Sequence, residues 1–145
     1  MITPPFGRLL TAMVTPFNND LSIDWNGVEK LAAHLISTGH DGIVVNGTTG
    51  EAPTTSDEEK IEIIKRVKAV VGKDKFVVAG AGNNETSHSV EQAKMAAAAG
   101  ADGLLVVTPY YNKPPQAGIA AHFTAMAEAD RKSTRLNSSH TDISR

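Results

Sequence analysis

The stretch NGTTGEAPT, residues 46–54, places two threonines between glycines, directly after the apolar run GIVV. A glycine-rich turn after a strand often binds phosphate through its backbone N–H groups. This turn lacks the phosphate-loop lysine and the G-x-G-x-x-G spacing, which indicates a different ligand. Thr48 and Thr49 can donate backbone and side-chain hydrogen bonds to a carboxylate, and a threonine hydroxyl can also pass on a proton. The spacing alone equally allows a plain glycine-rich turn.

A second set of polar groups lies in PYYNKPP, residues 109–115. The phenols of Tyr110 and Tyr111 can act as acids or bases where their surroundings tune the pKa, and two tyrosines at an interface are the simpler alternative. We interpret Glu51 as a structural loop residue and Lys113 as a surface residue rather than a nucleophile. The five histidines have no partner at a ligand-like spacing, so we predict no metal site.

The composition excludes several classes of protein. The chain has 145 residues, enough for one domain, and a formal net charge of -2 that gives no signature of nucleic-acid binding. It contains neither a membrane-spanning apolar stretch nor a signal-peptide pattern. Cysteine is absent, which excludes disulfides and thiolate metal sites. From these absences we expect a cytoplasmic protein that binds neither nucleic acid nor membrane.

Four short apolar runs predict the strands that would position the polar groups: Leu9–Thr15, Gly42–Asn46, Phe76–Gly80 and Gly103–Thr108. Near-continuous apolar runs are typical of parallel strands covered on both faces. Their interval, roughly 30 residues, matches a strand-plus-helix unit. The motif G-x-D-G begins both Gly39–Val45 and Gly100–Val106, which we attribute to the preference of turns for glycine and aspartate.

Helical patterns fill the intervals between the runs. The first predicted helix is an apolar stripe over Val28–Ile36, capped by Asp24. The second follows a capping box at Ser56–Glu59 and is marked by Ile61, Ile64, Val67, Lys68 and Val71. The third is an alanine-rich segment over Thr86–Ala99 that Gly100 ends, and the fourth begins near Gln116. This β-α alternation predicts a (β/α) barrel or an open parallel sheet. In either case the loops 15–17, 47–51, 81–86 and 109–115 would meet at the carboxyl ends of the strands.

Four βα units make only half of a (β/α)₈ barrel, whose typical length is about 250 residues. We therefore interpret residues 1–129 as a barrel truncated after its fourth unit. From Asp130 the sequence reads DRKSTRLNSSHTDISR, with only Leu136 and Ile143 apolar, and it cannot supply a fifth strand. This segment resembles the translation of a sequencing-adapter oligonucleotide. We expect residues 130–145 to be a foreign, disordered tail.

Four motifs identify a family resemblance over Leu9–Ala129. TAMVTPF, NGTTGE, AGAGNNET and VVTPYYNKPPQ, in this order, resemble the dihydrodipicolinate synthase family of pyruvate-dependent class I aldolases. The resemblance implies a TIM barrel and the condensation of pyruvate with aspartate 4-semialdehyde through a lysine Schiff base, with no cofactor. It also implies a homo-oligomer, a dimer of tight dimers, acting in lysine and diaminopimelate biosynthesis.

The resemblance assigns roles to three residues of this chain. Thr49 matches the threonine that holds the pyruvate carboxylate, and Thr48 matches the threonine of the proton relay. Tyr111 matches the relay tyrosine that reaches into the neighbouring subunit's site. The Schiff-base lysine, the proton-donating tyrosine and the substrate-binding arginine of the family have no counterpart in this chain, so we expect it to be inactive by itself.

Two other functions remain open alongside this one. The chain resembles the sibling aldolases, N-acetylneuraminate lyase and the 2-keto-3-deoxy-sugar-acid aldolases, in the glycine-threonine loop, although PYYNKPPQ favours the synthase. A non-catalytic half-barrel that binds a partner would be exposed to aggregation at its strand edges.

The resemblance also bears on feedback inhibition. Lysine-inhibited members carry histidines at the start of the second helix and a glutamate at the start of the third, where this chain has Asp57, Lys60 and His88. Asn84 and Tyr110 fit the inhibited pattern. A cationic Lys60 disfavours an incoming ammonium, so we expect weak or absent inhibition by lysine.

Overall fold

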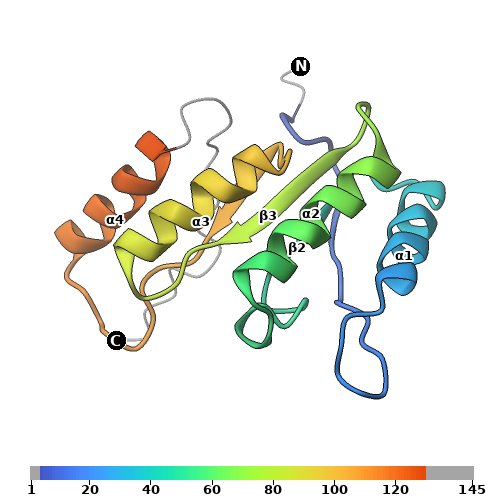
Figure 1. Cartoon of the computed structure of the whole chain (residues 1–145). Coiled ribbons are helices and arrows are strands. Elements are labelled where there is room, and N and C mark those ends of the chain that lie inside the picture. Colours follow the sequence, from blue (N-terminus) through green and yellow to red (C-terminus); the bar gives the residue numbers. More distant parts are fainter. Residues whose placement is uncertain (1–3, 130–145) are drawn as a thin grey trace.

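The computed structural model describes residues 4–129, and the predicted tail at 130–145 lies outside the described residues. Strands and helices alternate along the chain (Figure 1). The strands are β1 (Leu10–Ala12), β2 (Gly42–Val45), β3 (Phe76–Ala81) and β4 (Gly103–Val106). The helices are α1 (Trp25–Ser37), the short 3-10 helix η1 (Ala52–Thr54), α2 (Asp57–Val71), α3 (Thr86–Ala98) and α4 (Gln116–Ala129). The predicted alternation is confirmed.

The four strands form one parallel sheet in the order β1-β2-β3-β4. Their carboxyl ends therefore lie along one edge. Three strands are shorter than their apolar runs, and β2 is shorter by a single residue. Only Leu10–Ala12 is assigned to β1, although the N–H of Met13 still donates to the Val44 carbonyl at 2.9 Å. β4 ends at Val106 because its partner β3 ends at Ala81, where Gly82 turns the chain with φ 111°.

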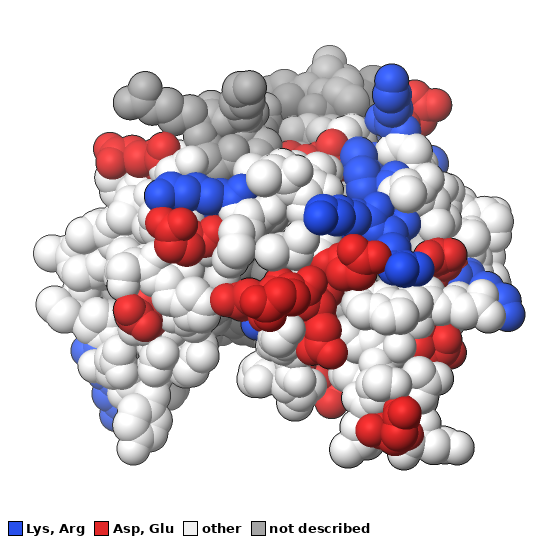
Figure 2. Space-filling model, in the orientation of Figure 1, with Lys and Arg blue, Asp and Glu red and all other residues white. Residues whose placement is uncertain are grey.

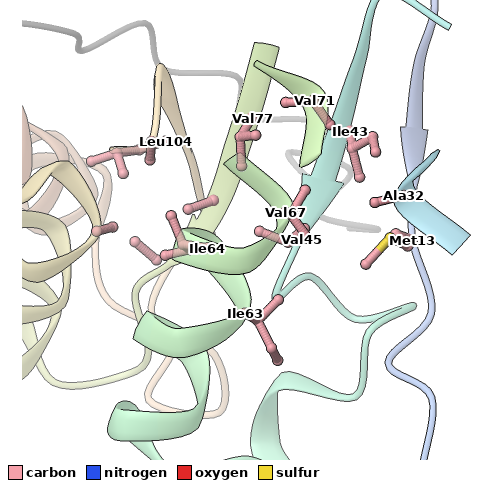
Figure 3. Close-up of a cluster of buried hydrophobic side chains, with 14 of the residues drawn as sticks. Met13, Ala32, Ile43, Val45, Ile63, Ile64, Val67, Val71, Val77 and Leu104 are labelled. Carbon is pink, nitrogen blue, oxygen red and sulfur yellow. The ribbon is translucent and has the colours of Figure 1, made fainter. Parts of the chain in front are cut away.

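The helices α1, α2 and α3 lie against one face of the sheet, and α4 follows beside α3 (Figure 1). The core lies between these two layers (Figure 3). Ile43 and Val77 from the strands meet Val67 and Ile64 from α2, and all four are at most 1% exposed. On α2 the buried face also includes Ile63, whereas the predicted Ile61 is only half-buried. The apolar periodicity therefore predicted this helix, but the buried face is rotated slightly from the predicted one.

Local signals in the sequence explain where the helices begin. The Asp24 carboxylate accepts a hydrogen bond from the Gly27 N–H at 2.9 Å, as expected for the cap of α1. At α2, the Ser56 hydroxyl accepts from the Glu59 N–H at 3.2 Å, and the Glu59 carboxylate accepts from the Ser56 N–H at 2.7 Å. This is the capping box that the sequence predicts.

The repeated aspartates of the G-x-D-G motif do more than form turns. Asp41 precedes β2, and its Oδ2 accepts from the N–H groups of Arg8 and Leu9 just before β1, at 2.7 and 3.0 Å. Asp102 precedes β4, and its Oδ2 accepts from the Val77 N–H of β3 at 2.8 Å. Each aspartate therefore ties the start of its own strand to the neighbouring strand. The preference of turns for glycine and aspartate therefore does not by itself explain these two aspartates.

On the face shown in Figure 2, acidic side chains gather near the middle, basic side chains lie above them and to the right, and the left part is largely uncharged. No extended area of one sign covers this face. Among residues 4–129, no helix combines the length and the hydrophobicity that a bilayer crossing requires.

Candidate functional site

A pocket of about 530 Å³ opens at the carboxyl ends of β2, β3 and β4. Loops that follow all three strands contribute to its wall, as predicted for a parallel sheet. Its lining residues are Asn46, Gly47, Thr48, Ala52, Pro53, Lys60, Gly80, Ala81, Gly82, Asn83, His88, Gln92, Leu105, Val106, Val107, Thr108 and Tyr110. The loop after β1, residues 15–17, does not line it. Its contribution is indirect, through a hydrogen bond to the turn after β2.

The turn after β2 is shaped by two residues in left-handed backbone conformations. Asn46 has φ 56° and Glu51 has φ 54°, which is uncommon for residues other than glycine. Asn46 is buried and its Nδ2 donates to the Lys60 carbonyl at 3.1 Å. Its carbonyl packs against the bare Cα of Gly80, where a Cβ would collide with it. Since no smaller residue exists, the start of the turn depends on that glycine.

Thr48 and Thr49 stand at the exposed tip of this turn. The N–H of Gly50 donates to the Gly47 carbonyl at 3.0 Å, and the N–H of Glu51 donates to the Thr48 carbonyl at 3.1 Å. Within residues 4–129, no hydrogen bond engages the backbone N–H or the hydroxyl of either threonine. Both threonines therefore keep their amide and hydroxyl donors available for a ligand. Thr48 lines the pocket, whereas Thr49 is not among the residues that line it.

The two tyrosines after β4 point to different surroundings. Tyr110 lines the pocket and is 51% exposed. Tyr111 has φ 69°, is 93% exposed and is not among the residues that line the pocket. The next residue, Asn112, donates from Nδ2 to the Asn84 carbonyl at 3.0 Å and holds the loop in place. Thus the described chain does not bring Tyr111 to Thr48.

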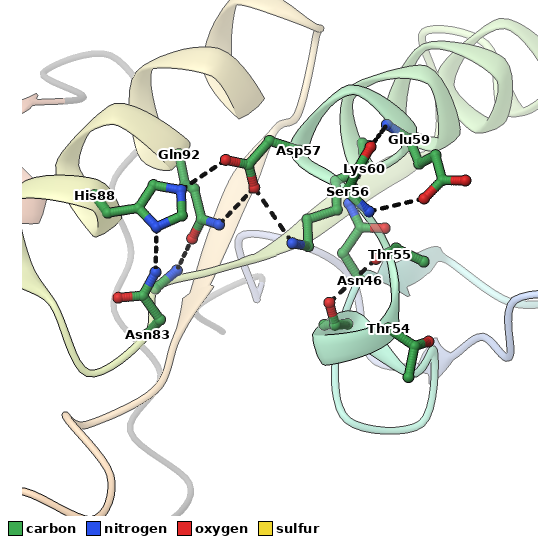
Figure 4. Close-up of polar contacts among 12 residues, drawn as sticks. Asn46, Thr54, Thr55, Ser56, Asp57, Glu59, Lys60, Asn83, His88 and Gln92 are labelled. Atoms are coloured by element: carbon green, nitrogen blue, oxygen red, sulfur yellow. Dashed lines mark hydrogen bonds and ion pairs between the residues drawn. The ribbon is translucent and has the colours of Figure 1, made fainter.

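A polar cluster centred on Asp57 joins α2 to α3 at the pocket wall (Figure 4). His88 Nε2 lies 2.6 Å from Asp57 Oδ2, and Asp57 Oδ1 accepts from Gln92 Nε2 at 2.9 Å and from Lys60 Nζ at 3.3 Å. His88 Nδ1 accepts from Asn83 Nδ2 at 2.8 Å, so the ring proton sits on Nε2 and is donated to Asp57. The other four residues of the cluster all line the pocket.

Hydrogen bonds within the cluster stabilise the negative charge of the Asp57 carboxylate. Burial by itself raises the pKa of the Asp57 carboxyl, but the bonds from His88, Gln92 and Lys60 outweigh it and lower the pKa to about 2. Asp57 is therefore ionised at neutral pH and forms an ion pair with Lys60 in the pocket wall. Among residues 4–129, no group of three or more histidine, aspartate and glutamate side chains could hold a metal ion.

Sequence reasoning missed this cluster as a unit. It named Asp57, Lys60 and His88 only by resemblance and did not connect them. One signal was available: His88 and Gln92 are four residues apart on α3, a spacing that puts both side chains on one face. Their shared partner on α2 is 31 residues from His88, and no local pattern reveals it.

Comparisons with known proteins agree with this architecture. Residues 5–136 match the Dihydrodipicolinate synthetase family. The chain belongs to this family. A 4-hydroxy-tetrahydrodipicolinate synthase of Cutibacterium acnes is 61% identical over 130 residues, and synthase 2 of Streptomyces coelicolor is 58% identical over 125 residues. These alignments cover 89% and 86% of this chain but 44% and 42% of the relatives, so the chain spans less than half of their length.

Solved structures give the same result. A dihydrodipicolinate synthase from Bacillus anthracis matches with a TM-score of 0.87 and 44% identity, covering 93% of this chain and 46% of that one. The Acinetobacter baumannii synthase, solved in complex with pyruvate, matches with a TM-score of 0.85 and 44% identity over 88% of this chain and 44% of that one. N-acetylneuraminate lyase from Mycoplasma synoviae has a TM-score of 0.80 and 28% identity over 88% and 45%. The described residues thus form the first four βα units of a TIM barrel.

Proposed function

We propose that the protein to which this chain belongs condenses pyruvate with aspartate 4-semialdehyde to give 4-hydroxy-tetrahydrodipicolinate. The observation that carries the proposal is the turn at Thr48 and Thr49, with unpaired amide and hydroxyl donors at the carboxyl edge of the sheet. Such a group of donors suits a carboxylate. The identity to synthases, higher than that to the lyase, supports this reaction over the sibling aldolases.

Three residues of this chain have roles in the proposal. Thr49 holds the pyruvate carboxylate, while the Thr48 hydroxyl relays a proton. Tyr111 completes the relay in the neighbouring subunit, and its 93% exposure supports a role outside its own pocket. A site shared between subunits requires an oligomer, and we propose a homotetramer built from two tight dimers, acting in the cytoplasm.

We further propose that this chain of 145 residues does not catalyse the condensation alone. A Schiff base needs an unprotonated lysine amine that attacks the keto carbon of pyruvate. Lys60 is the only lysine among the described residues that lines the pocket, and its ammonium is paired with Asp57. In that contact the Lys60 nitrogen is engaged by the Asp57 carboxylate and is not free to attack the keto carbon.

The test separates binding from catalysis. Pyruvate is titrated into the ¹⁵N-labelled chain, and shifts of the Thr48 and Thr49 amides are expected, with a weaker response in Thr49→Val. Borohydride treatment with pyruvate is expected to leave the mass unchanged. Absence of any shift at the turn would contradict the carboxylate site. A reduced adduct on Lys60 would contradict the claim of inactivity, and shifts confined to another surface would favour a non-catalytic binding half-barrel.

Feedback inhibition by lysine is proposed to be weak. The Lys60 ammonium stands in the pocket wall, and the carboxylate of Asp57 is already occupied by three donors. An incoming ammonium would thus meet a like charge without a free anionic partner. Strong inhibition of the enzyme by lysine at micromolar concentration would refute this.

A further inference from the structure

We infer that Thr15 is the positioning residue of the carboxylate-binding turn, an inference that rests on the function proposed for Thr48 and Thr49. Thr15 follows β1, on a loop that does not line the pocket. It is 7% exposed, and its hydroxyl donates to the Gly50 carbonyl at 2.7 Å. The two residues are 35 positions apart, so this bond joins the end of β1 to the turn after β2.

Few other interactions fix the position of this turn, residues 47–50. The backbone bonds from Gly50 to Gly47, from Glu51 to Thr48 and from Ala52 to Gly47 are all local. Its start is held by Asn46 against Gly80. In the described part of the chain, Thr15 gives the one side-chain hydrogen bond that reaches residues 47–50. Apart from packing, the middle of the turn, which carries both threonines, is therefore tied to distant parts of the described chain by a single hydroxyl.

Packing makes that hydroxyl effective. Gly50 is buried, and a Cβ on it would lie 3.1 Å from the Met13 carbonyl oxygen and 3.3 Å from Thr15 Oγ1. The Gly50 peptide is thus pressed onto the end of β1 with its carbonyl directed at Thr15. Without the hydroxyl, this carbonyl loses its only partner among the described residues. The Gly50 carbonyl can then regain a hydrogen bond by rotating toward water, and this rotation also moves the donors of Thr48 and Thr49.

The chain offers a matched control at Thr55. Thr55 is also 7% exposed, and its hydroxyl donates to the Ala52 carbonyl at 3.1 Å, within the adjacent 3-10 turn. Thr15→Val and Thr55→Val therefore remove the same group from equally buried sites. Thr15→Ser keeps the hydroxyl, and Thr15→Ala removes it without a methyl beside Gly50 if the valine variant does not fold.

The variants are compared in the complete 145-residue chain by amide hydrogen exchange at Gly50 and Glu51 and by NMR titration with pyruvate. We expect Thr15→Val to speed exchange at both amides and to raise the pyruvate dissociation constant by roughly 3- to 10-fold, the loss of one hydrogen bond. Thr15→Ser and Thr55→Val are expected to stay within about twofold of the parent chain.

Equal effects of Thr15→Val and Thr55→Val, or failure of Thr15→Ser to preserve the parent behaviour, would overturn the inference. The readouts also separate it from the proposed function. If the parent chain does not bind pyruvate, the function of the turn is wrong, and the positioning role is still decided by exchange at Gly50 and Glu51. If pyruvate binds and exchange is unchanged in Thr15→Val, the positioning role is wrong and the function stands.

Discussion

The imidazole of His88 donates its Nε2 proton to Asp57 Oδ2 at 2.6 Å, and this contact connects the first turns of α3 and α2. Since Asp57 also accepts from Gln92 and Lys60, one carboxylate organises a wall of the pocket. The amino-terminal turn of α2 adds a favourable helix dipole for the negative charge. Asp57 is therefore important both for stability and for the shape of the site.

Stability is expected to depend on Asp57 at acidic pH. Its pKa is about 2 in the folded chain against 3.8 as the ordinary value, so the unfolded chain binds the proton more readily. The stabilisation is thus complete above pH 4 and is lost as pH falls through 2, at most about 2 kcal/mol. Asp57→Asn should flatten this part of the unfolding profile measured by urea titration. Asp74→Asn, at an exposed site, should leave it unchanged; identical profiles for parent and Asp57→Asn would refute the assignment.

The strand tie made by Asp102 predicts a second effect on stability. Its Oδ2 accepts from the Val77 N–H at 2.8 Å and from Lys68 Nζ at 2.6 Å. Asp102→Ala leaves the Val77 N–H without this partner, and we expect the free energy of unfolding to fall by about 1–2 kcal/mol. Asp74 lies two residues before β3 and has no side-chain partner among the described residues, so Asp74→Ala should be neutral in the same denaturation experiment. Equal losses would show that the position before a strand matters, and not the bond.

The sequence predicted the elements because their signals are local. The run at Phe76–Gly80 is apolar throughout, and the Ser56–Glu59 box closes over four residues, so neither requires the rest of the fold. The threonines of the turn were also found locally, between their glycines. By contrast, the bond from Thr15 to Gly50 depends on which strands become neighbours, and no pattern in the chain encodes that pairing directly.

The close approach of Gly80 to Asn46 predicts that even alanine is too large there. A Cβ would meet the Asn46 carbonyl and would stand 3.0 Å from the Gly47 nitrogen. Gly80→Ala should therefore destabilise the chain by roughly 2–3 kcal/mol, the usual cost of overpacking. It should also displace the amide resonances of Thr48 and Thr49. Gly118→Ala is the control, because its Cβ has ordinary contacts at 3.4 Å and alanine favours the α4 helix. A thermal melt of Gly80→Ala that matches the parent would refute the prediction.

His122 predicts a second pH dependence, at a higher pH. It is 2% exposed on α4, and its Nδ1 lies 2.9 Å from the Thr86 hydroxyl of α3. Burial lowers the pKa of this imidazole below 6.5. The interaction with the Val107 backbone raises the pKa, but by less than burial lowers it. The unfolded chain therefore binds the proton first as the pH falls below 6.5, so protonation weakens the packing of α3 against α4. Stability should rise with pH up to about 6.5 and level off above it.

The measurement is the urea midpoint of the parent chain and of His122→Gln between pH 5 and 8. The glutamine amide can still bond to Thr86 but does not titrate in this range, so the variant should lose part of the slope below pH 6.5. His34→Gln on α1 is the control for histidines in general, since that side chain is exposed. If His122→Gln retains the full slope of the parent and His34→Gln removes it, the buried histidine is not the titrating group.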